Sequence, residues 1–447
     1  MIQSNISLPN TDNNMSEEIL KSLYDWNPWI EGEFPKELSG FKRDYFLDPY
    51  LEVPEIKILE GPRRAGKSTL LYQVIEKILK HDKGVLYINF EDEILKGFSL
   101  GEIVAAYQKT GPINYLFIDE IQNCKDWVPY IRKSYDRKEI NQIWISGSNS
   151  SLIKNELATL LTGRNLTIHI HPLSFKEYLF FKSIEVAKLP FSTKKEALIK
   201  SNFKNYLELG SFPAVTLRHV LQKELLINYF DDFIYKDIGS RYDVNPVKIR
   251  ELGMFLASNS AKSFSYRGIA SALGMHANTI VDYCSYFTEI FLFSELYKFD
   301  YSLKTQIGSE KKIYSIDTGL ASAVSFRFSE DIGRMLENLV YNELRRRGEE
   351  IYFHKQNYEC DFLIKKELTV LNAIQVTLDL GIPEVKKREI RGLLEAIKVH
   401  RLTRGMILTM DEEGYEEISV NNETLKIDIL PVWKWLLVKQ IGSITNN

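Results

Sequence analysis

The sequence predicts an α/β fold in several domains, the first of which contains a parallel sheet. Four short apolar runs alternate with helix-compatible segments between residues 55 and 146, a pattern typical of parallel strands covered on both faces. The chain has 447 residues, and at roughly 150 residues per domain this length suggests about three domains. With 44% hydrophobic and 26% charged residues the composition is globular, which excludes a disordered or fibrous chain.

Charge, cysteine spacing and hydropathy exclude further classes of protein. Lys and Arg number 57 against 60 Asp and Glu, and the net charge of -3 rules out a globally basic nucleic-acid coat, although not one basic face. The three cysteines lie far apart, with neither disulfide-framework nor metal-knuckle spacing. Since the N-terminus lacks a signal-peptide pattern and no window supplies the roughly 18 apolar residues of a membrane span, we expect a cytoplasmic protein with no membrane partner.

Residues 1–50 are predicted to form an N-terminal tail and docking segment. The chain up to about residue 15 is rich in Asn and Ser and has few large apolar side chains, which predicts a disordered tail. From Ile19 to Phe46, helical spacing mixes with aromatic residues. We expect this segment to cover a neighbouring domain.

Residues 51–172 are predicted to form the α/β core. A helical stretch from Lys67 to Lys80 follows the first strand after a glycine loop. The expected strands are Glu55–Glu60, Gly84–Phe90, Tyr115–Asp119 and Ile143–Ser146. Their near-continuous apolar character predicts burial on both faces of the sheet.

The rest of the chain is predicted to divide into three parts. Residues 173–238 show apolar side chains at i, i+3, i+4 spacing and are expected to form a helical lid. In residues 239–300, helices at Tyr266–Leu273 and Asn278–Phe291 flank a turn at Gly274, which suits a winged helix. Residues 301–447 alternate helices, such as Gly333–Arg347 and Pro383–Lys398, with strand-like pieces and predict a second α/β domain.

A phosphate-binding motif follows the first strand. Residues 61–68 match the spacing G-x-x-x-x-G-K-[ST] where a strand gives way to a helix. Glycines let backbone N–H groups surround phosphate oxygens, and the helix N-terminus attracts the anion. Lys67 adds positive charge at the β- and γ-phosphates of ATP, and the Ser68 hydroxyl can bind Mg²⁺. The predicted nucleotide contacts are Gly61, Pro62, Arg63, Arg64, Ala65, Gly66, Lys67, Ser68 and Thr69.

Two acids end the third strand. Asp119 can hold the Mg²⁺ water shell opposite Ser68, and Glu120 can polarise an attacking water. Because they come about fifty residues after Lys67 and follow an intervening strand, we interpret them as a Walker B pair.

Three further residues are candidates for roles at the γ-phosphate. Ser148 or Asn149, after the fourth strand, could sense this phosphate, although both residue types are also common in turns. Arg164 could supply positive charge to the transition state, in cis or across a subunit boundary, or could be an ordinary surface or capping arginine.

Together these motifs resemble a known family. The segments that carry the resemblance are Leu59–Thr69, Phe117–Gln122, SGSNSSL, LTGR and Pro172–Tyr178, with Asp25–Pro28, Gly210–Pro213, Tyr235–Ile238 and Pro431–Trp435. The chain is similar to the AAA-type, STAND-like P-loop ATPases of archaea and bacteria whose C-terminal half resembles a restriction endonuclease. The resemblance covers nearly the whole chain and implies ATP binding and hydrolysis by a P-loop domain, followed by a winged helix and a nuclease-fold domain.

The winged-helix interpretation leaves DNA as a candidate partner. His276 or Asn278 could meet base edges. However, Met275–Tyr297 contains no Lys or Arg for phosphate contacts, and its dense aromatic residues favour packing within the protein.

A PD-(D/E)XK nuclease binds Mg²⁺ with an acidic residue on a helix, an Asp on a strand and an acid-x-Lys motif on the next strand. Here Glu337 and Asp361 provide the first two, and are possible metal ligands, but the last motif reads Gln375-Val-Thr377. Both replacements weaken cation binding and catalysis. A lysine could come from elsewhere, with Lys365 and Lys366 nearest in sequence. Arg345–Arg347 and Lys386–Arg388 could follow phosphates or form solvated helix faces.

The leading hypothesis is a Mg-dependent ATPase in which Lys67, Glu120 and Arg164 act in catalysis and the nuclease-like domain is degenerate. The alternatives are an ATP-regulated DNA nuclease and a nucleotide-dependent switch that turns ATP over rarely. The expected partners are ATP and, as further candidates, DNA, another protein or a second copy of the chain.

Overall fold

The computed structural model describes residues 11–150, 163–186, 190–325, 332–420 and 423–438. The chain folds into two compact units, Met1–Ile170 and His171–Asn447. Within the described ranges, none of the helices has the length and apolar composition needed to cross a membrane.

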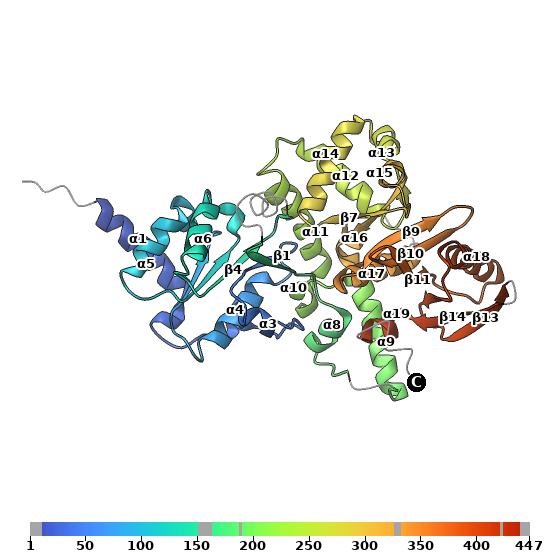
Figure 1. Ribbon diagram of the computed structural model, residues 1–447, viewed down its shortest axis with the longest axis horizontal. Coiled ribbons are helices and arrows are strands. Elements are labelled where there is room, and N and C mark those ends of the chain that lie inside the picture. The colour runs from blue at the N-terminus through green and yellow to red at the C-terminus, as the bar shows by residue number, and fades with distance from the viewer. Residues whose placement is uncertain (1–10, 151–162, 187–189, 326–331, 421–422, 439–447) are drawn as a thin grey trace, which may run out of the picture. The chain divides into compact units, whose positions relative to one another are not determined.

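The first unit is a parallel sheet covered on both faces (Figure 1). The strands lie in the order β2-β3-β4-β1-β5, and all neighbouring strands are parallel. They are β1 (Ile56–Glu60), β2 (Val85–Asn89), β3 (Tyr115–Asp119), β4 (Gln142–Gly147) and β5 (Asn165–His169). The predicted α/β class and the four predicted strands, β1 to β4, are confirmed. The edge strand β5 was not predicted from the sequence.

Helices pack on both faces of this sheet because strand side chains alternate in direction. Ile56 and Ile58 join one core with α1, α5 and α6, whereas Leu59 joins the opposite core with α4. The helices are α1 (Thr11–Trp26), η1 (Pro28–Ile30), α2 (Lys36–Ser39), α3 (Asp48–Leu51), α4 (Lys67–Ile78), η2 (Leu95–Gly97), α5 (Leu100–Gln108), η3 (Ile121–Asn123) and α6 (Trp127–Asp136).

The segment expected to dock on this domain packs directly against it. Leu23 of α1 is fully buried in the core beneath α5, and the side-chain amide of Asn27 donates to the backbone oxygen of Tyr87 at 2.7 Å. The Asn27 side-chain oxygen accepts from the Tyr87 backbone N–H, also at 2.7 Å. This reciprocal pair fixes the N-terminal segment to strand β2.

The second unit begins with helices and a small sheet. The three-stranded sheet has the order β6-β8-β7, with antiparallel pairs. Strand β6 precedes the helices α13 and α14 in the chain, and β7 and β8 follow them. The elements are α8 (Phe175–Phe181), α9 (Thr193–Leu209), α10 (Pro213–Leu217), α11 (Gln222–Asp232), the π-helix η4 (Phe233–Ile238), α12 (Pro246–Ser258), β6 (Ser263–Phe264), α13 (Tyr266–Leu273), α14 (Ala277–Glu289), β7 (Phe293–Tyr297), α15 (Leu303–Gly308), β8 (Lys311–Ser315) and α16 (Thr318–Val324). The winged-helix assignment stays a prediction.

The C-terminal part contains a mixed six-stranded sheet in the order β13-β14-β12-β11-β10-β9. Helix α17 packs on one face and α18 on the other, as the two separate cores show (Figure 1). The elements are α17 (Ile332–Arg346), β9 (Glu350–Lys355), β10 (Glu359–Lys366), β11 (Thr369–Val376), α18 (Pro383–His400), β12 (Arg404–Thr409), β13 (Gly414–Val420), β14 (Glu423–Pro431) and α19 (Val432–Leu437). The pairings β11–β12 and β12–β14 are parallel, and the others are antiparallel.

Candidate nucleotide-binding site

The loop between β1 and α4 can form only with glycine at two positions. A Cβ atom on Gly61 would lie 2.1 Å from the backbone oxygen of Ile170, so any side chain there would push the loop away from the chain that follows β5. Gly66 has φ of 95°, a left-handed conformation that L-residues with side chains rarely adopt. Helix α4 begins at the next residue, Lys67, so its first amides face the loop.

The Lys67 side chain is buried inside this loop. Its ammonium group donates to the backbone oxygens of Gly61 and Pro62, both at 3.1 Å, and lies 3.6 Å from a Glu120 carboxylate oxygen. The side chain is only 3% exposed. The lysine is therefore already directed at the centre of the loop, where a phosphate would meet it.

The Asp119 carboxylate lies at the carboxyl end of β3 and is held from three sides. The Tyr87 hydroxyl of β2 donates to one oxygen at 2.7 Å, and the Ser146 hydroxyl of β4 donates to the other. Ser68 also forms a side-chain hydrogen bond with Asp119. Burial and, next, the negative charge of Glu120 raise the pKa of Asp119 above its ordinary value. Added positive charge near Asp119 would be favourable.

The Glu120 side chain is directed back toward Lys67 by a strained turn. Its φ of 53° and ψ of 47° are left-handed, which is uncommon for a residue with a side chain. The Ser148 hydroxyl donates to the Glu120 carboxylate at 3.0 Å, and the Gln122 amide donates to the same oxygen. Burial raises the pKa of Glu120, but the charges of Lys67 and Arg63 and these hydrogen bonds outweigh it and lower the pKa below its ordinary value. Glu120 is therefore stabilised as a carboxylate.

The structure places Arg164 away from this site, which corrects the expectation that it acts in cis. Strand β5 runs parallel to β1, and the backbone oxygen of Arg164 accepts from the N–H of Ile56, the first residue of β1. The phosphate loop lies at the opposite end of the same strand. The Arg164 side chain pairs with Asp136 at 3.0 Å. A role across a subunit boundary stays a prediction.

The sensor candidates lie where β4 ends. Ser148 and Asn149 are both buried, and Ser148 contacts Glu120 directly. The sensor role of Asn149 stays a prediction. Residues 151 and 152 of the SGSNSSL segment, and Leu161 and Thr162 of LTGR, lie outside the described residues.

Sequence reasoning missed three contributors to this site, namely Tyr87, Gln122 and Ser146. Tyr87 stands in an apolar strand, where a tyrosine is usually a packing residue. The available indication of its role is its position in the sheet. Strand β2 pairs with β3 in a register that aligns Tyr87 with Phe117, two residues before Asp119. Ser146 lies in β4, which pairs with β3 on the other side, so both strands flank the acid.

The two predicted C-terminal metal ligands lie in the second unit and meet a lysine that the sequence did not indicate. The ammonium group of Lys312, from β8, lies 2.9 Å from a Glu337 oxygen and 3.0 Å from an Asp361 oxygen. Lys365, which we considered as a source of the amine, pairs instead with Glu350 at 2.7 Å. Gln375 lies beside Asp361, accepting from its backbone N–H at 3.3 Å.

The fold and the phosphate loop define a P-loop protein with an AAA domain. A model of the family described as "AAA domain" matches residues 53–179, and one described as "Domain of unknown function (DUF8612)" matches residues 200–331. The second match extends across β8, and so includes the complete three-stranded sheet.

Full-length relatives define the family more closely. The chain is 38% identical to "Uncharacterized protein MJ1544" of Methanocaldococcus jannaschii over 91% of this chain and 93% of that protein. It therefore belongs to the same family as that archaeal protein. An uncharacterized protein of Haemophilus influenzae is 29% identical, over 88% of this chain and 98% of its own length.

Solved structures show more distant likeness. A mutant of RuvB from Thermotoga maritima is 13% identical with a TM-score of 0.28, covering 63% of this chain and 88% of that one. AMPPCP-bound DnaA from Aquifex aeolicus is 15% identical with a TM-score of 0.26, covering 63% and 90%.

Proposed function

We propose that the protein is a Mg²⁺-dependent ATPase whose catalytic site lies between the phosphate loop and the ends of β3 and β4. The AAA domain supports nucleotide binding and hydrolysis at the level of the domain class. The observation that carries the finer assignment is the convergence of Lys67, Asp119 and Glu120 at one edge of the parallel sheet. Ligands of such sheets bind at the carboxyl ends of the strands.

Each side chain has a distinct part in the proposed reaction. The loop amides and the Lys67 ammonium would hold the β- and γ-phosphates. The Ser68 hydroxyl and the Asp119 carboxylate are hard oxygen donors that suit Mg²⁺, and they already lie within hydrogen-bonding reach of each other. When bound, this ion would neutralise charge on the phosphates. Glu120, held as a carboxylate, would orient and polarise the attacking water.

Nucleotide binding would also free Glu120. Within the protein, Lys67 contacts two loop carbonyls and Glu120. Phosphate oxygens carry more negative charge than carbonyls and would draw the ammonium toward them. Glu120 would then keep its hydrogen bonds with Ser148 and Gln122 while losing its cationic neighbour.

The C-terminal part is proposed to be a nuclease-like domain without nuclease activity. Its helix acid and strand acid are present, but Gln375 stands where a second acid would be needed. Thr377 replaces the lysine of the motif, and the lysine that meets the two acids, Lys312, comes from β8 instead. DNA, a protein partner and a second copy of the chain remain predicted partners. A plasmid cut by the protein with ATP and Mg²⁺ would contradict this part of the proposal.

The test is ATP turnover by the purified protein, with Mg²⁺ and with EDTA, compared between wild type and Lys67→Ala. We expect hydrolysis that requires Mg²⁺ and is lost in the variant. Lys77→Ala is the matched control, since Lys77 lies on the same helix but is half-exposed and pairs with Asp48. Full turnover in Lys67→Ala would overturn the proposal. Nucleotide retained through purification with little turnover would support the switch hypothesis instead.

A further inference from the structure

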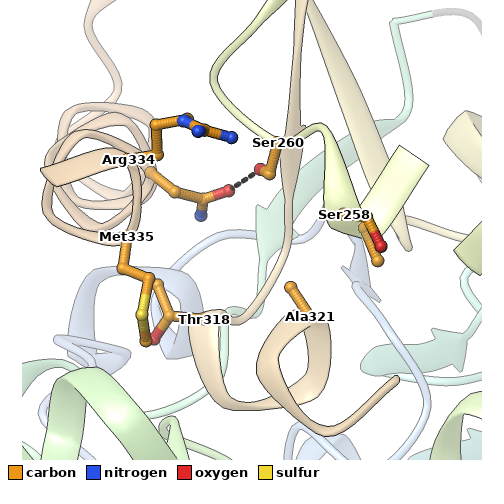
Figure 2. A pocket seen from close by; sticks show the side chains of 8 residues that line it. Ser258, Ser260, Thr318, Ala321, Arg334 and Met335 are labelled. Atoms are coloured by element: carbon orange, nitrogen blue, oxygen red, sulfur yellow. Dashed lines mark hydrogen bonds between the residues drawn. The ribbon is translucent and has the colours of Figure 1, made fainter. Parts of the chain in front are cut away.

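Two cavities of the second unit share Arg334 in their lining, and they differ greatly in size. The smaller, of about 10 Å³, is lined by residues that include Ser260, Thr318 and Arg334 (Figure 2). The Ser260 hydroxyl bonds there to Asn338, and the space suits one water at most. The larger cavity, of about 780 Å³, is bounded by α17, the β9–β10 turn, the end of β11 and the start of α18.

The wall of the larger cavity carries a charged cluster centred on Lys312. This ammonium lies 2.9 Å from Glu337, 3.0 Å from Asp361 and 2.8 Å from Glu359. The Lys312 side chain is 2% exposed, and Glu337 and Asp361 are buried with it. An ammonium group has three protons to donate, so these three carboxylates use its full capacity.

The cluster does not fit a divalent cation while Lys312 is present. The ammonium nitrogen occupies the point on which the Glu337 and Asp361 oxygens converge, and a second cation at that point would meet its positive charge at close range. No group of three metal-ligating side chains suited to a metal ion is found among the described residues. The two acids that sequence reasoning offered as metal ligands thus already share a cation that the protein itself supplies.

Three further polar side chains contact the cluster or lie beside it. The second Asp361 oxygen accepts from the backbone N–H of Val376 at 2.9 Å, and the Tyr314 hydroxyl donates to Glu337 at 2.7 Å. Glu389 of α18 accepts from the Gln375 amide at 2.6 Å. Gln375, which replaces the missing acid, therefore bonds to a carboxylate, an arrangement that a second acid at this position could not form without a shared proton.

We infer that Lys312 is the resident cation of the C-terminal pocket and takes the place that a divalent metal holds in a metal-dependent nuclease. Lys312 comes from β8, a strand of the small sheet, and ties that sheet to the acids of α17 and β10. On this inference the pocket holds no metal ion. The cation that faces its carboxylates comes instead from the neighbouring three-stranded sheet. This inference rests on the proposed inactive nuclease-like domain and is independent of ATP hydrolysis.

The first experiment counts bound Mn²⁺ in nucleotide-free full-length protein by electron paramagnetic resonance of the free ion. We expect wild type and Asp361→Asn to bind the same number of ions, because the acid already has a cation. Any Mn²⁺ bound at the phosphate loop is present in both proteins, so it does not change the difference between their numbers of bound ions. One more ion bound by wild type than by Asp361→Asn would overturn the inference, whether or not the protein hydrolyses ATP.

The second experiment removes the resident cation. Lys312→Met keeps much of the side-chain volume and leaves the acids unpaired, so we expect it to bind one Mn²⁺ that wild type does not bind. Lys311→Met is the matched control, because Lys311 is also buried but pairs with Glu295 at 2.9 Å and with the Tyr266 hydroxyl at 2.8 Å within the small sheet.

The additional ion should disappear when Glu337→Gln or Asp361→Asn is combined with Lys312→Met. A folded Lys312→Met protein, judged by circular dichroism, that gains no ion would overturn the inference, as would an equal gain in Lys311→Met. If Lys312→Met does not fold, the comparison of wild type with Asp361→Asn decides.

Discussion

The ammonium group of Lys67 lies 3.6 Å from the Glu120 carboxylate, with both side chains almost fully buried. The pair joins the residue proposed to hold phosphate to the residue proposed to activate water. In a buried site such a pair is stable only when the remaining polar groups are satisfied, and here loop carbonyls, Ser148 and Gln122 satisfy them. In the proposed mechanism ATP would replace Glu120 as the partner of the lysine, and this one contact would couple nucleotide binding to release of the proposed general base.

Glu120→Gln should separate binding from hydrolysis. The amide keeps the size of the side chain but cannot act as a base, and loss of general-base catalysis typically costs about 10²–10⁴-fold in rate. We expect ATP hydrolysis to fall by this amount while ATP affinity stays the same or rises, since Lys67 is released. Single-turnover kinetics and equilibrium titration measure the two quantities. Glu93→Gln, at an exposed acid, is the control. Equal losses of affinity and rate would contradict the assignment.

Tyr87→Phe should weaken the response to Mg²⁺. The change removes the hydroxyl that donates to Asp119 at 2.7 Å but leaves the ring in the core. Loss of a group that orients a metal ligand typically costs about 10–100-fold in metal affinity. We expect the Mg²⁺ concentration for half-maximal ATPase activity to rise by roughly tenfold or more. Tyr107→Phe, at another buried tyrosine of the same domain, should leave it unchanged. No shift in Tyr87→Phe would show that Asp119 does not depend on this bond.

The nucleotide site could be predicted from the sequence because its main residues are contiguous. The phosphate loop and the two acids of β3 each form a short motif, and their order relative to the strands fixes which edge of the sheet they share. Two edge strands, β5 and β13, were harder to predict. Strand β5 is largely exposed, and β13 contains adjacent acids, so neither shows the apolar run that marks a buried strand.

Lys312 could not be assigned from sequence for a different reason. It lies 25 residues from Glu337 and 49 from Asp361, on another sheet, and no local motif connects them. The available signal was a lysine inside a strand whose neighbours are buried. Such a residue needs an anionic partner, but only the folded chain shows which one.

His400 should make the C-terminal part sensitive to acid. Burial, and next the neighbouring His354, lower the pKa of His400 from 6.5 to about 4. In the unfolded chain the histidine binds its proton near 6.5, so between pH 6.5 and 4 the unfolded state holds more protons than the folded state. The free energy of unfolding therefore falls as pH is lowered through this window.

His400→Gln should reduce this sensitivity, because glutamine does not titrate. Urea unfolding at pH 7, 5.5 and 4.5 would measure the difference. We expect the wild type to lose stability more steeply than the variant as pH falls. Curves that run parallel over the window would show that His400 does not contribute.

Gly210→Ala should destabilise the second unit strongly. Gly210 ends α9 with φ of 77°, and a Cβ atom there would lie 2.0 Å from an oxygen of the buried Asp317. That carboxylate cannot move easily, because it accepts from the backbone N–H and the hydroxyl of Ser211, both at 2.7 Å, and from the N–H of Leu320 at 2.8 Å. We expect the free energy of unfolding to fall by more than about 3 kcal/mol, from strain, crowding and broken hydrogen bonds together.

Gly274→Ala is the comparison variant, at a glycine with positive φ but without crowding. Gly274 also has a left-handed φ, 61°, but an added Cβ meets nothing within 4 Å. It should therefore show only the conformational cost, about 1–2 kcal/mol. Both free energies can be measured by urea denaturation followed by circular dichroism. Gly210 has ψ of -162°, a backbone region that is essentially restricted to glycine, so its conformational cost is also higher than that of Gly274. A loss in Gly210→Ala no larger than that in Gly274→Ala would show that neither this strain nor the Asp317 carboxylate, which joins the end of α9 to the start of α16, resists the added Cβ.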